Sequence, residues 1–266
     1  MFGSVRADLD YALEFTRVYQ SEWNPIRREL ACLRMQLPYV HTPIGPEDLI
    51  VGGMKHGYVG FSPQFGGVNT HSYFYLAGQV AKALESIRDQ VDGGYIRQVE
   101  EMTRYWETEC TFYKERKLFA ARRGRPMASP AFFWGAVRLA GTNVDLDLLV
   151  HAGIPGLHEH IDRYRRENGN SEFYEGMDQA LDLLSDTCRR YAASAGALME
   201  TASPERKAEL AEIRENLLHI AVKKPQTFKQ ALQLVWIYAI CADLMNYGRM
   251  DNYLCDFYVR DLEEGR

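Results

Sequence analysis

Residues 227–246 read TFKQALQLVWIYAICADLMN, and this stretch decides how the chain must fold. Thr227 and Gln230 fit a capping box, in which the hydroxyl and the amide side chain each satisfy a backbone N–H that a first helical turn leaves free. The helix that they open, Ala231 to about Asn246, is apolar almost all round, so other structure must enclose it. Its longest uncharged run, Gln230–Ala242, has about 13 residues, whereas a membrane span needs roughly 20. We therefore expect a core helix, although little of the remaining sequence looks able to enclose it fully.

The helical period continues along most of the chain in both directions. Apolar residues recur at spacings of three and four, which indicates helices with one buried face. Proline at a first helical position and an N-cap residue before it mark two of the starts. A proline or a pair of glycines marks two of the ends. The predicted helices run from Pro25 to a stop at Pro38, from Leu76 to Val91 with a stop at Gly93-Gly94, from Ile96 to about Ala121, from a cap at Ser171 through Tyr191, and from Pro204 to Ile220.

Strand signals are few and short. We expect strands at Leu49–Val51, His56–Phe61 and Ala136–Ala140, with a long irregular glycine-rich loop over residues 51–69. No internal repeat and no linker rich in serine or proline divides the chain. The sequence therefore predicts a predominantly α fold with a few short strands, and residues 1–266 as a single unit.

Charge and cysteine content limit the class of protein. The 31 basic and 36 acidic residues of the 266 give a net charge of −5, which disfavours nucleic acid as a partner. Five cysteines, odd in number, widely spread and without a C-x-x-C pair, indicate reduced thiols rather than a disulfide framework. The first ten residues contain Arg6, Asp8 and Asp10, so we expect no signal peptide. We expect a cytoplasmic protein with no membrane partner.

Spacing alone names no reaction. His151, His158 and His160 invite a metal hypothesis, but glycine and proline interrupt the stretch between the first two, and the last two cannot share a helix face. A solvated helix start is the alternative, and we expect no metal. No phosphate-binding glycine motif and no G-x-S-x-G motif is present. The cysteines are interpreted as core thiols, with Cys255 alone in a setting of mixed polarity.

Several segments, in order, resemble the N-terminal region of the pyruvate formate-lyase family of glycyl radical enzymes. The most specific one, FWGAVRLAGTNVDLD at 133–147, is similar to a family segment of the type R-x-A-G-x-N-x-D-L. The other matching segments are 47–52, 148–157, 173–182, 210–216, 224–236 and 248–265.

The resemblance implies both a fold and a chemistry. The fold is the N-terminal part of a ten-stranded α/β barrel wrapped in helices. The chemistry uses a glycyl radical that passes its spin to a cysteine, whose thiyl radical then attacks the substrate. In the family both loops lie beyond the point where this sequence stops, so no catalytic residue is expected here. We expect no cofactor bound by this segment, and a glycyl radical on the missing C-terminal part, installed by an activating enzyme with S-adenosylmethionine and an iron–sulfur cluster.

The resemblance also implies substrate-binding residues at Arg138, Thr142 and Asn143. Arg138 matches an arginine that contributes to carboxylate binding in pyruvate-cleaving members, a task that suits a bidentate guanidinium. A structural salt bridge is the alternative role. Some dehydrating members place Gly-His in this stretch, where this chain has Gly141-Thr142-Asn143. A diol-dehydratase mechanism that relies on that histidine is therefore not indicated.

The functional hypothesis is the N-terminal segment of a formate C-acetyltransferase-like lyase or a related radical lyase or dehydratase. It implies a small-molecule substrate and a radical-activating enzyme as partners, and leaves a homodimer open. The segment alone is expected to be inactive. A non-catalytic helical binding or assembly module derived from the family is the alternative, and a small-molecule enzyme unrelated to it is a third hypothesis.

Overall fold

The structure is a computed structural model, and it describes residues 5–54, 76–109, 117–118, 120–122, 144–242, 244 and 246–266. The described residues form two compact units. The first contains residues 5–40 and the described residues between 76 and 122, and the second contains residues 41–54 and the described residues from 144 onward. No described helix has the length and apolar character that a membrane span requires. Two compact units can belong to one domain, so the expectation that residues 1–266 form a single unit stays a prediction.

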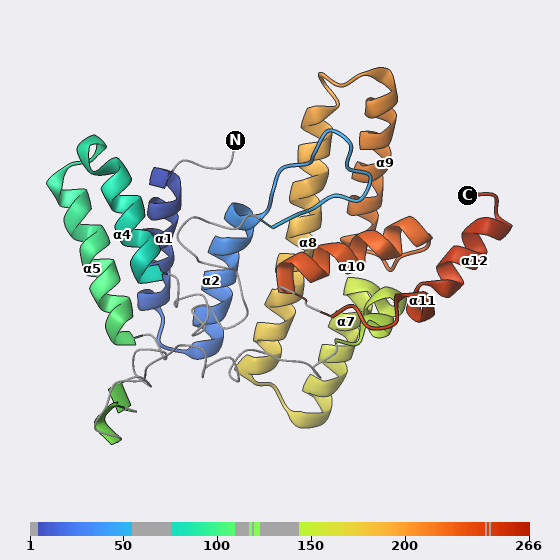
Figure 1. The fold of residues 1–266 in the computed structure, drawn as a ribbon. Coiled ribbons are helices and arrows are strands. Elements are labelled where there is room, and N and C mark those ends of the chain that lie inside the picture. Colours follow the sequence, from blue (N-terminus) through green and yellow to red (C-terminus); the bar gives the residue numbers. More distant parts are fainter. Residues whose placement is uncertain are drawn as a thin grey trace. The chain divides into compact units, whose positions relative to one another are not determined.

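The first unit is a small helical assembly around an aromatic core. Its helices are α1 (Val5–Ser21), α2 (Pro25–Val40), α4 (Leu76–Ile87) and α5 (Gly93–Glu109), with a 3₁₀ turn, η1, at Arg88–Gln90. Helix α1 contacts α2, α4 and α5 (Figure 1). Trp106 of α5 is 1% exposed and packs on Phe15 of α1, and its Nε1 donates to Thr16 Oγ1 at 2.8 Å. The aromatic contact and the satisfied indole N–H together join α5 to α1.

The second unit is built on a helical hairpin. Its helices are α7 (Leu146–Asn168), α8 (Glu172–Leu198), α9 (Pro204–Ile220), α10 (Phe228–Ala242), α11 (Met250–Tyr253) and α12 (Cys255–Glu263). Helices α8 and α9 run side by side, and α10 crosses them (Figure 1). The N-terminus of α9 is capped as predicted, with Arg206 N–H donating to Ser203 Oγ at 3.3 Å.

Helix α10 is the centre of this unit. Eight of its residues are buried and none is exposed, because α7, α8, α9, α12 and the 41–54 segment surround it. The prediction of an enclosed core helix is confirmed. The expectation that the remaining sequence would not enclose it fully is not contradicted, because the other seven residues of α10 are only partly buried. The capping box is half confirmed: Gln230 N–H donates to Thr227 Oγ1 at 3.2 Å, but Gln230 Oε1 accepts from Gln226 N–H, one residue before the cap.

The 41–54 segment is a loop, not the strand predicted at Leu49–Val51. Its ends form an antiparallel bridge between His41 and Met54. In between, side chains of the helices take the place of a neighbouring strand. Gln233 accepts from Val51 N–H at 2.9 Å and donates to Val51 C=O at 2.8 Å, and Trp236 Nε1 donates to Gly52 C=O at 2.7 Å. The backbone groups of this apolar run are therefore satisfied by α10, which is what buried polar groups require.

Three helix boundaries differ from the prediction for local reasons. Helix α2 continues through Pro38 to Val40, because a proline in the last turn removes only one backbone hydrogen bond. Gly93 and Gly94 begin α5 rather than end a helix, because Asp92 Oδ1 accepts from Tyr95 N–H at 2.9 Å and caps the new helix. Helix α7 continues past the glycine-proline stretch with one kink, at Gly153 (φ 66°, ψ 177°).

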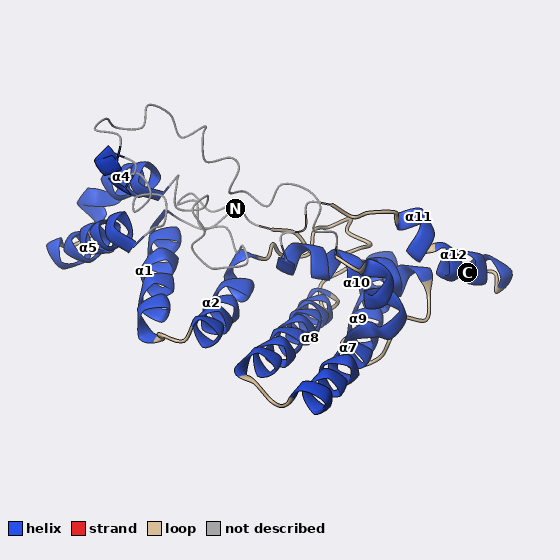
Figure 2. Ribbon diagram, turned by 90° about the horizontal axis from the view of Figure 1, so that it is seen from below, coloured by secondary structure: helices blue, strands red, loops and turns tan. Residues whose placement is uncertain are grey.

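The fold class is confirmed at the level of a mostly helical chain. Among the described residues the structure has no strand beyond the His41–Met54 bridge (Figure 2). The barrel stays a prediction. The expected strands at His56–Phe61 and Ala136–Ala140 lie outside the described residues.

Candidate functional site

The three residues expected to bind substrate, Arg138, Thr142 and Asn143, lie outside the described residues. Two polar clusters in the second unit bring ionisable groups of different helices together. Neither was predicted from the sequence, apart from the histidines of α7.

The first cluster is an ion-pair network between α7 and α8. Asp178 of α8 pairs with Arg165 and accepts from His158 Nδ1 at 2.9 Å. Arg165 also pairs with Asp162, one turn earlier on its own helix, at 2.7 Å. Partial burial alone would raise the pKa of Asp178, but the hydrogen bonds from Arg165 and His158 outweigh it and lower that pKa.

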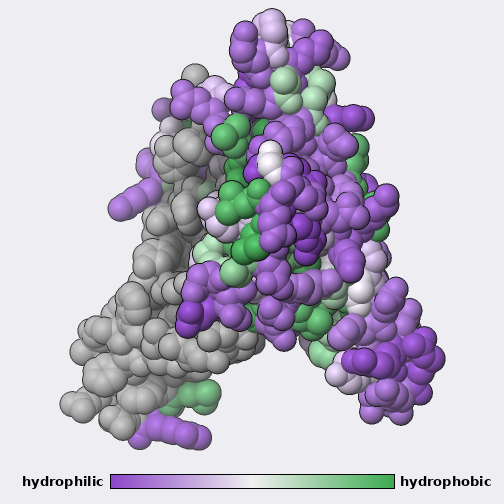
Figure 3. All heavy atoms as spheres, turned by 90° about the vertical axis from the view of Figure 1, so that its right-hand side faces the viewer, coloured by the Kyte–Doolittle hydropathy of each residue, from purple (hydrophilic) through white to green (hydrophobic). Residues whose placement is uncertain are grey.

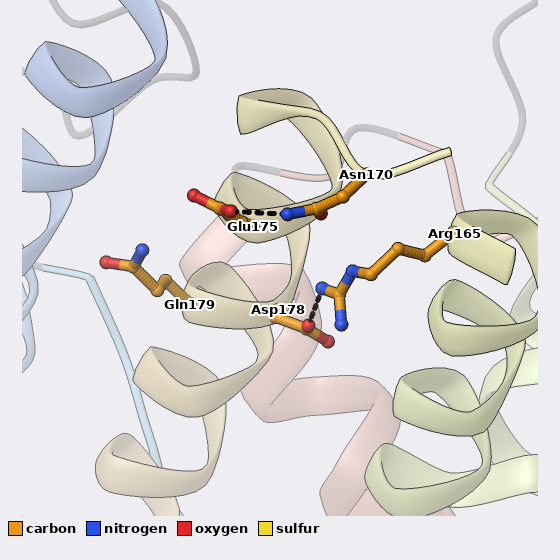
Figure 4. A pocket seen from close by; sticks show the side chains of 5 residues that line it. All are labelled: Arg165, Asn170, Glu175, Asp178 and Gln179. Carbon is orange, nitrogen blue, oxygen red and sulfur yellow. Dashed lines mark hydrogen bonds and ion pairs between the residues drawn. The ribbon is translucent and has the colours of Figure 1, made fainter. Parts of the chain in front are cut away.

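A shallow hollow of about 340 Å³ opens beside this network (Figure 4). Arg165 and Asp178 face each other across it, and Asn170 donates to Glu175 at 2.8 Å, while Gln179 points away from the pair. Because Arg165 and Asp178 each have a partner of opposite charge, the network can hold α7 against α8 but offers no free acid or base. We interpret this cluster as structural.

His151 and His158, two residues of the metal hypothesis that the sequence analysis set aside, make contacts with different partners. His151 contacts Asp147 of its own helix, with 3.0 Å between Nδ1 and the backbone oxygen, whereas His158 reaches across to α8. In the part of the chain that the structure describes, no three His, Cys, Asp or Glu side chains are arranged to hold a metal ion.

The second cluster lies where α8, α10 and the start of the 41–54 segment meet. Arg190 Nη2 lies 3.4 Å from His41 Nδ1, and His41 Nε2 lies 3.9 Å from Cys241 Sγ. Tyr191 donates to Thr42 C=O at 2.9 Å and so fixes the backbone next to His41. A guanidinium has only donors, so Nδ1 of His41 accepts, and the proton of the neutral ring is on Nε2 facing the sulfur.

The pKa shifts of this cluster disfavour a nucleophilic cysteine–histidine pair. Burial, followed by the charge of Arg190, lowers the pKa of His41 to about 4, so the imidazole is neutral near pH 7. Burial raises the pKa of Cys241 to about 12, so the sulfur is a thiol. Covalent catalysis by cysteine needs a thiolate, commonly beside a charged imidazole. Cys241, like the buried Cys188 and Cys32, is therefore a core thiol, as predicted, while Cys110 lies outside the described residues.

Sequence reasoning did not single out His41 or Arg190. They are 149 residues apart, and no local pattern marks either one. Only the packing of the 41–54 segment against α8 and α10 brings them together.

The lowered pKa of His41 predicts a pH-dependent stability. The unfolded chain protonates this histidine near pH 6.5 and the folded chain only near pH 4, so the unfolded state binds more protons between these values. The contribution of His41 to the free energy of unfolding is fully present above pH 6.5. It is lost as the pH falls toward 4, and the loss is about 3 kcal/mol at most for a shift of this size. Urea unfolding at a series of pH values measures it.

The matched variants for this measurement are His41→Asn and His151→Asn. His41→Asn should flatten the slope between pH 6.5 and 4, whereas the exposed His151→Asn should retain it. The stabilising effect of Asp178 is lost only at lower pH, below the ordinary pKa of a carboxyl group, because its pKa in the folded state is lowered. An unchanged slope in His41→Asn would contradict the assignment.

Comparisons with known proteins give a consistent picture over the whole chain. The family model described as "Pyruvate formate lyase-like" matches residues 4–266. The probable dehydratase YbiW of Escherichia coli K12 is 28% identical over an alignment of 283 residues, gaps included, which covers 95% of this chain and 33% of that protein. The (2S)-3-sulfopropanediol dehydratase of Klebsiella oxytoca is 28% identical over 187 residues, which cover 63% of this chain and 23% of that protein.

The fold has a solved counterpart. A glycyl radical enzyme from Archaeoglobus fulgidus superposes with a TM-score of 0.67 at 21% identity, over 99% of this chain and 38% of that one. The chain spans about a third of the length of the first curated relative.

Proposed function

The chain belongs to the pyruvate formate lyase-like family, as the resemblance of its segments predicts, and on that premise we propose that it is part of a glycyl radical dehydratase. The observation that carries the proposal is the similarity over 95% of the chain to a probable dehydratase, together with the sulfopropanediol dehydratase match. These relatives favour a dehydratase over the formate C-acetyltransferase-like lyase that the sequence hypothesis named first. The substrate class is a small hydroxylated carbon compound, which loses water.

In this proposal the groups that carry out the radical chemistry lie outside this chain. The glycyl radical and the catalytic cysteine belong to polypeptide outside these 266 residues, and a separate activating enzyme installs the radical. Cys32, Cys188 and Cys241 are at least half-buried, and burial raises their pKa values, as suits core thiols, whereas Cys255 is exposed. A cytoplasmic setting and a homodimer remain expectations.

The test is activation of the whole gene product under anaerobic conditions with its activating enzyme. We expect an electron paramagnetic resonance signal of a glycyl radical, and water loss from a diol or another hydroxylated substrate. The 266-residue chain alone, treated in the same way, should give no radical. Formate and acetyl-coenzyme A formed from pyruvate would overturn the dehydratase proposal. A whole gene product that never forms a radical would favour the non-catalytic module.

Arg138 is proposed to bind an anionic group of the substrate where the substrate carries one. The change Arg138→Lys keeps the charge but loses the planar bidentate contact. A charge-assisted hydrogen bond of this kind contributes about 1.5–3 kcal/mol, so KM should rise about 10- to 100-fold with a smaller change in kcat. Steady-state kinetics on the activated enzyme measure it.

The control for that measurement is Arg122→Lys, at an exposed arginine of the described part of the chain. It should leave KM unchanged. If Arg138→Lys lowers the melting temperature and leaves KM at the wild-type value, the arginine forms a structural salt bridge instead. Thr142 and Asn143 remain proposed neighbours in the same site.

A further inference from the structure

Helix α12 carries an apolar stripe that faces solvent. Cys255, Tyr258, Val259 and Leu262 are spaced i, i+3, i+4 and i+7, which places them on one face of a helix. Tyr258 is 52% exposed, Val259 45% and Leu262 58%, and Cys255 is also exposed. Large apolar side chains that are exposed one at a time are ordinary, but a contiguous helical stripe of them indicates a contact surface.

The stripe is not exposed because the helix is loose. The neighbouring face of α12 is attached to the start of α10, and the ring of Tyr258, at the edge of the stripe, lies 5.7 Å from the ring of Phe228. Phe257 is 3% exposed, and Asp261 Oδ2 accepts from Phe228 N–H at 2.9 Å. Arg260 donates to Gln226 C=O at 3.2 Å. These contacts fix the rotation of α12 about its axis, so the stripe points outward in the folded unit.

Figure 3 shows hydrophobic side chains among strongly hydrophilic ones on one face of the molecule. A helix that is apolar on two sides is typical of a helix enclosed on both. Helix α12 has a partner on one side only within the described residues.

We propose that this stripe packs against the remaining polypeptide of the same enzyme, the part that the longer relatives have and this chain does not. The proposal rests on the proposed function, because it takes the whole protein to be of the relatives' size. The chain spans about a third of the first curated relative, so some two-thirds of such a protein is available as the partner.

A second copy of this chain fits the stripe less well. Nine residues of helix are about 14 Å long, whereas a stable interface between separate proteins buries about 800 Å² on each partner. A contact within one chain avoids the entropy cost of association, so a short stripe suffices there.

The test is the reaction of Cys255 with a thiol-alkylating reagent in the whole, unactivated gene product. We expect Cys255 to react at least about tenfold more slowly than a cysteine placed at the next position, Asp256→Cys in a Cys255→Ser background. Asp256 is exposed and points about 100° away around the helix, so it serves as a matched control. Peptide mapping by mass spectrometry identifies the labelled residue.

The outcomes separate the two proposals. Slow reaction of Cys255 that persists on dilution supports the packing, and the measurement needs no radical, so a failed dehydratase assay does not affect it. Equal rates at 255 and 256 would overturn the packing even if the enzyme dehydrates its substrate. Protection that disappears on dilution would also overturn it, in favour of a second copy. As a further check, Leu262→Ser should speed the alkylation of Cys255, whereas Glu263→Ser should not.

Discussion

Replacing Gly153 by alanine is expected to lower the free energy of unfolding by about 2–6 kcal/mol. Two effects add. The backbone at Gly153 has φ of 66°, which side chains rarely adopt, at a cost of about 1–3 kcal/mol. The added Cβ would also lie 2.5 Å from Lys224 Cα, a backbone atom that cannot rotate away, and overpacking of this kind costs about 1–3 kcal/mol. Urea unfolding followed by circular dichroism measures the loss.

Gly169→Ala provides the comparison. Gly169 has φ of 82° but nothing within 4 Å of an added Cβ, so only the backbone strain applies. The difference between the two variants isolates the close approach of the kink in α7 to the connection between α9 and α10. Equal losses would show that this approach is absent.

Replacing Gln233 by leucine is expected to lower the free energy of unfolding by about 2–6 kcal/mol. The amide of Gln233 is the partner of both the N–H and the C=O of Val51, and Val51 is fully buried. Each buried backbone group left without a partner costs about 1–3 kcal/mol. The 41–54 segment should also become accessible to protease, which limited proteolysis of the variant measures.

The control for this variant is Gln179→Leu, because Gln179 is an exposed glutamine on α8. It should change stability by less than about 0.5 kcal/mol. If Gln233→Leu behaves like the control and the 41–54 segment remains protected, the side chain does not hold the loop.

The sequence predicted the helices well because their information is local. The cap at Ser203-Pro204 and the apolar residues of α9 and α10 can be read from neighbouring residues, and the structure confirms them. The stripe of α8 is buried at Leu184, Cys188 and Tyr191, but Phe173 and Met177 at its start are exposed. Apart from the helix boundaries, which differ for local reasons, the errors arose where a distant partner decides the outcome. Leu49–Val51 has the composition of a strand, but the partners of its backbone are side chains of α10, which no window around it contains.

The same reason limits the candidate site. The His41 cluster joins residues separated by 149 and 200 positions, so spacing gives no signal for it. The substrate-binding prediction at Arg138, Thr142 and Asn143 rests on resemblance to a family, and it remains a prediction to be tested by kinetics.

The hydrogen bonds between Gln233 of α10 and the backbone of Val51 also set an order of events during synthesis. Gln233 follows Val51 by 182 residues, so the loop leaves the ribosome long before its partner exists. At about 5–20 residues per second, that wait lasts roughly 10–35 s. During this interval an apolar stretch with unpaired backbone is open to chaperones and to other nascent chains. The slow, sequence-distant closure of this loop makes it a natural last step in the folding of the second unit.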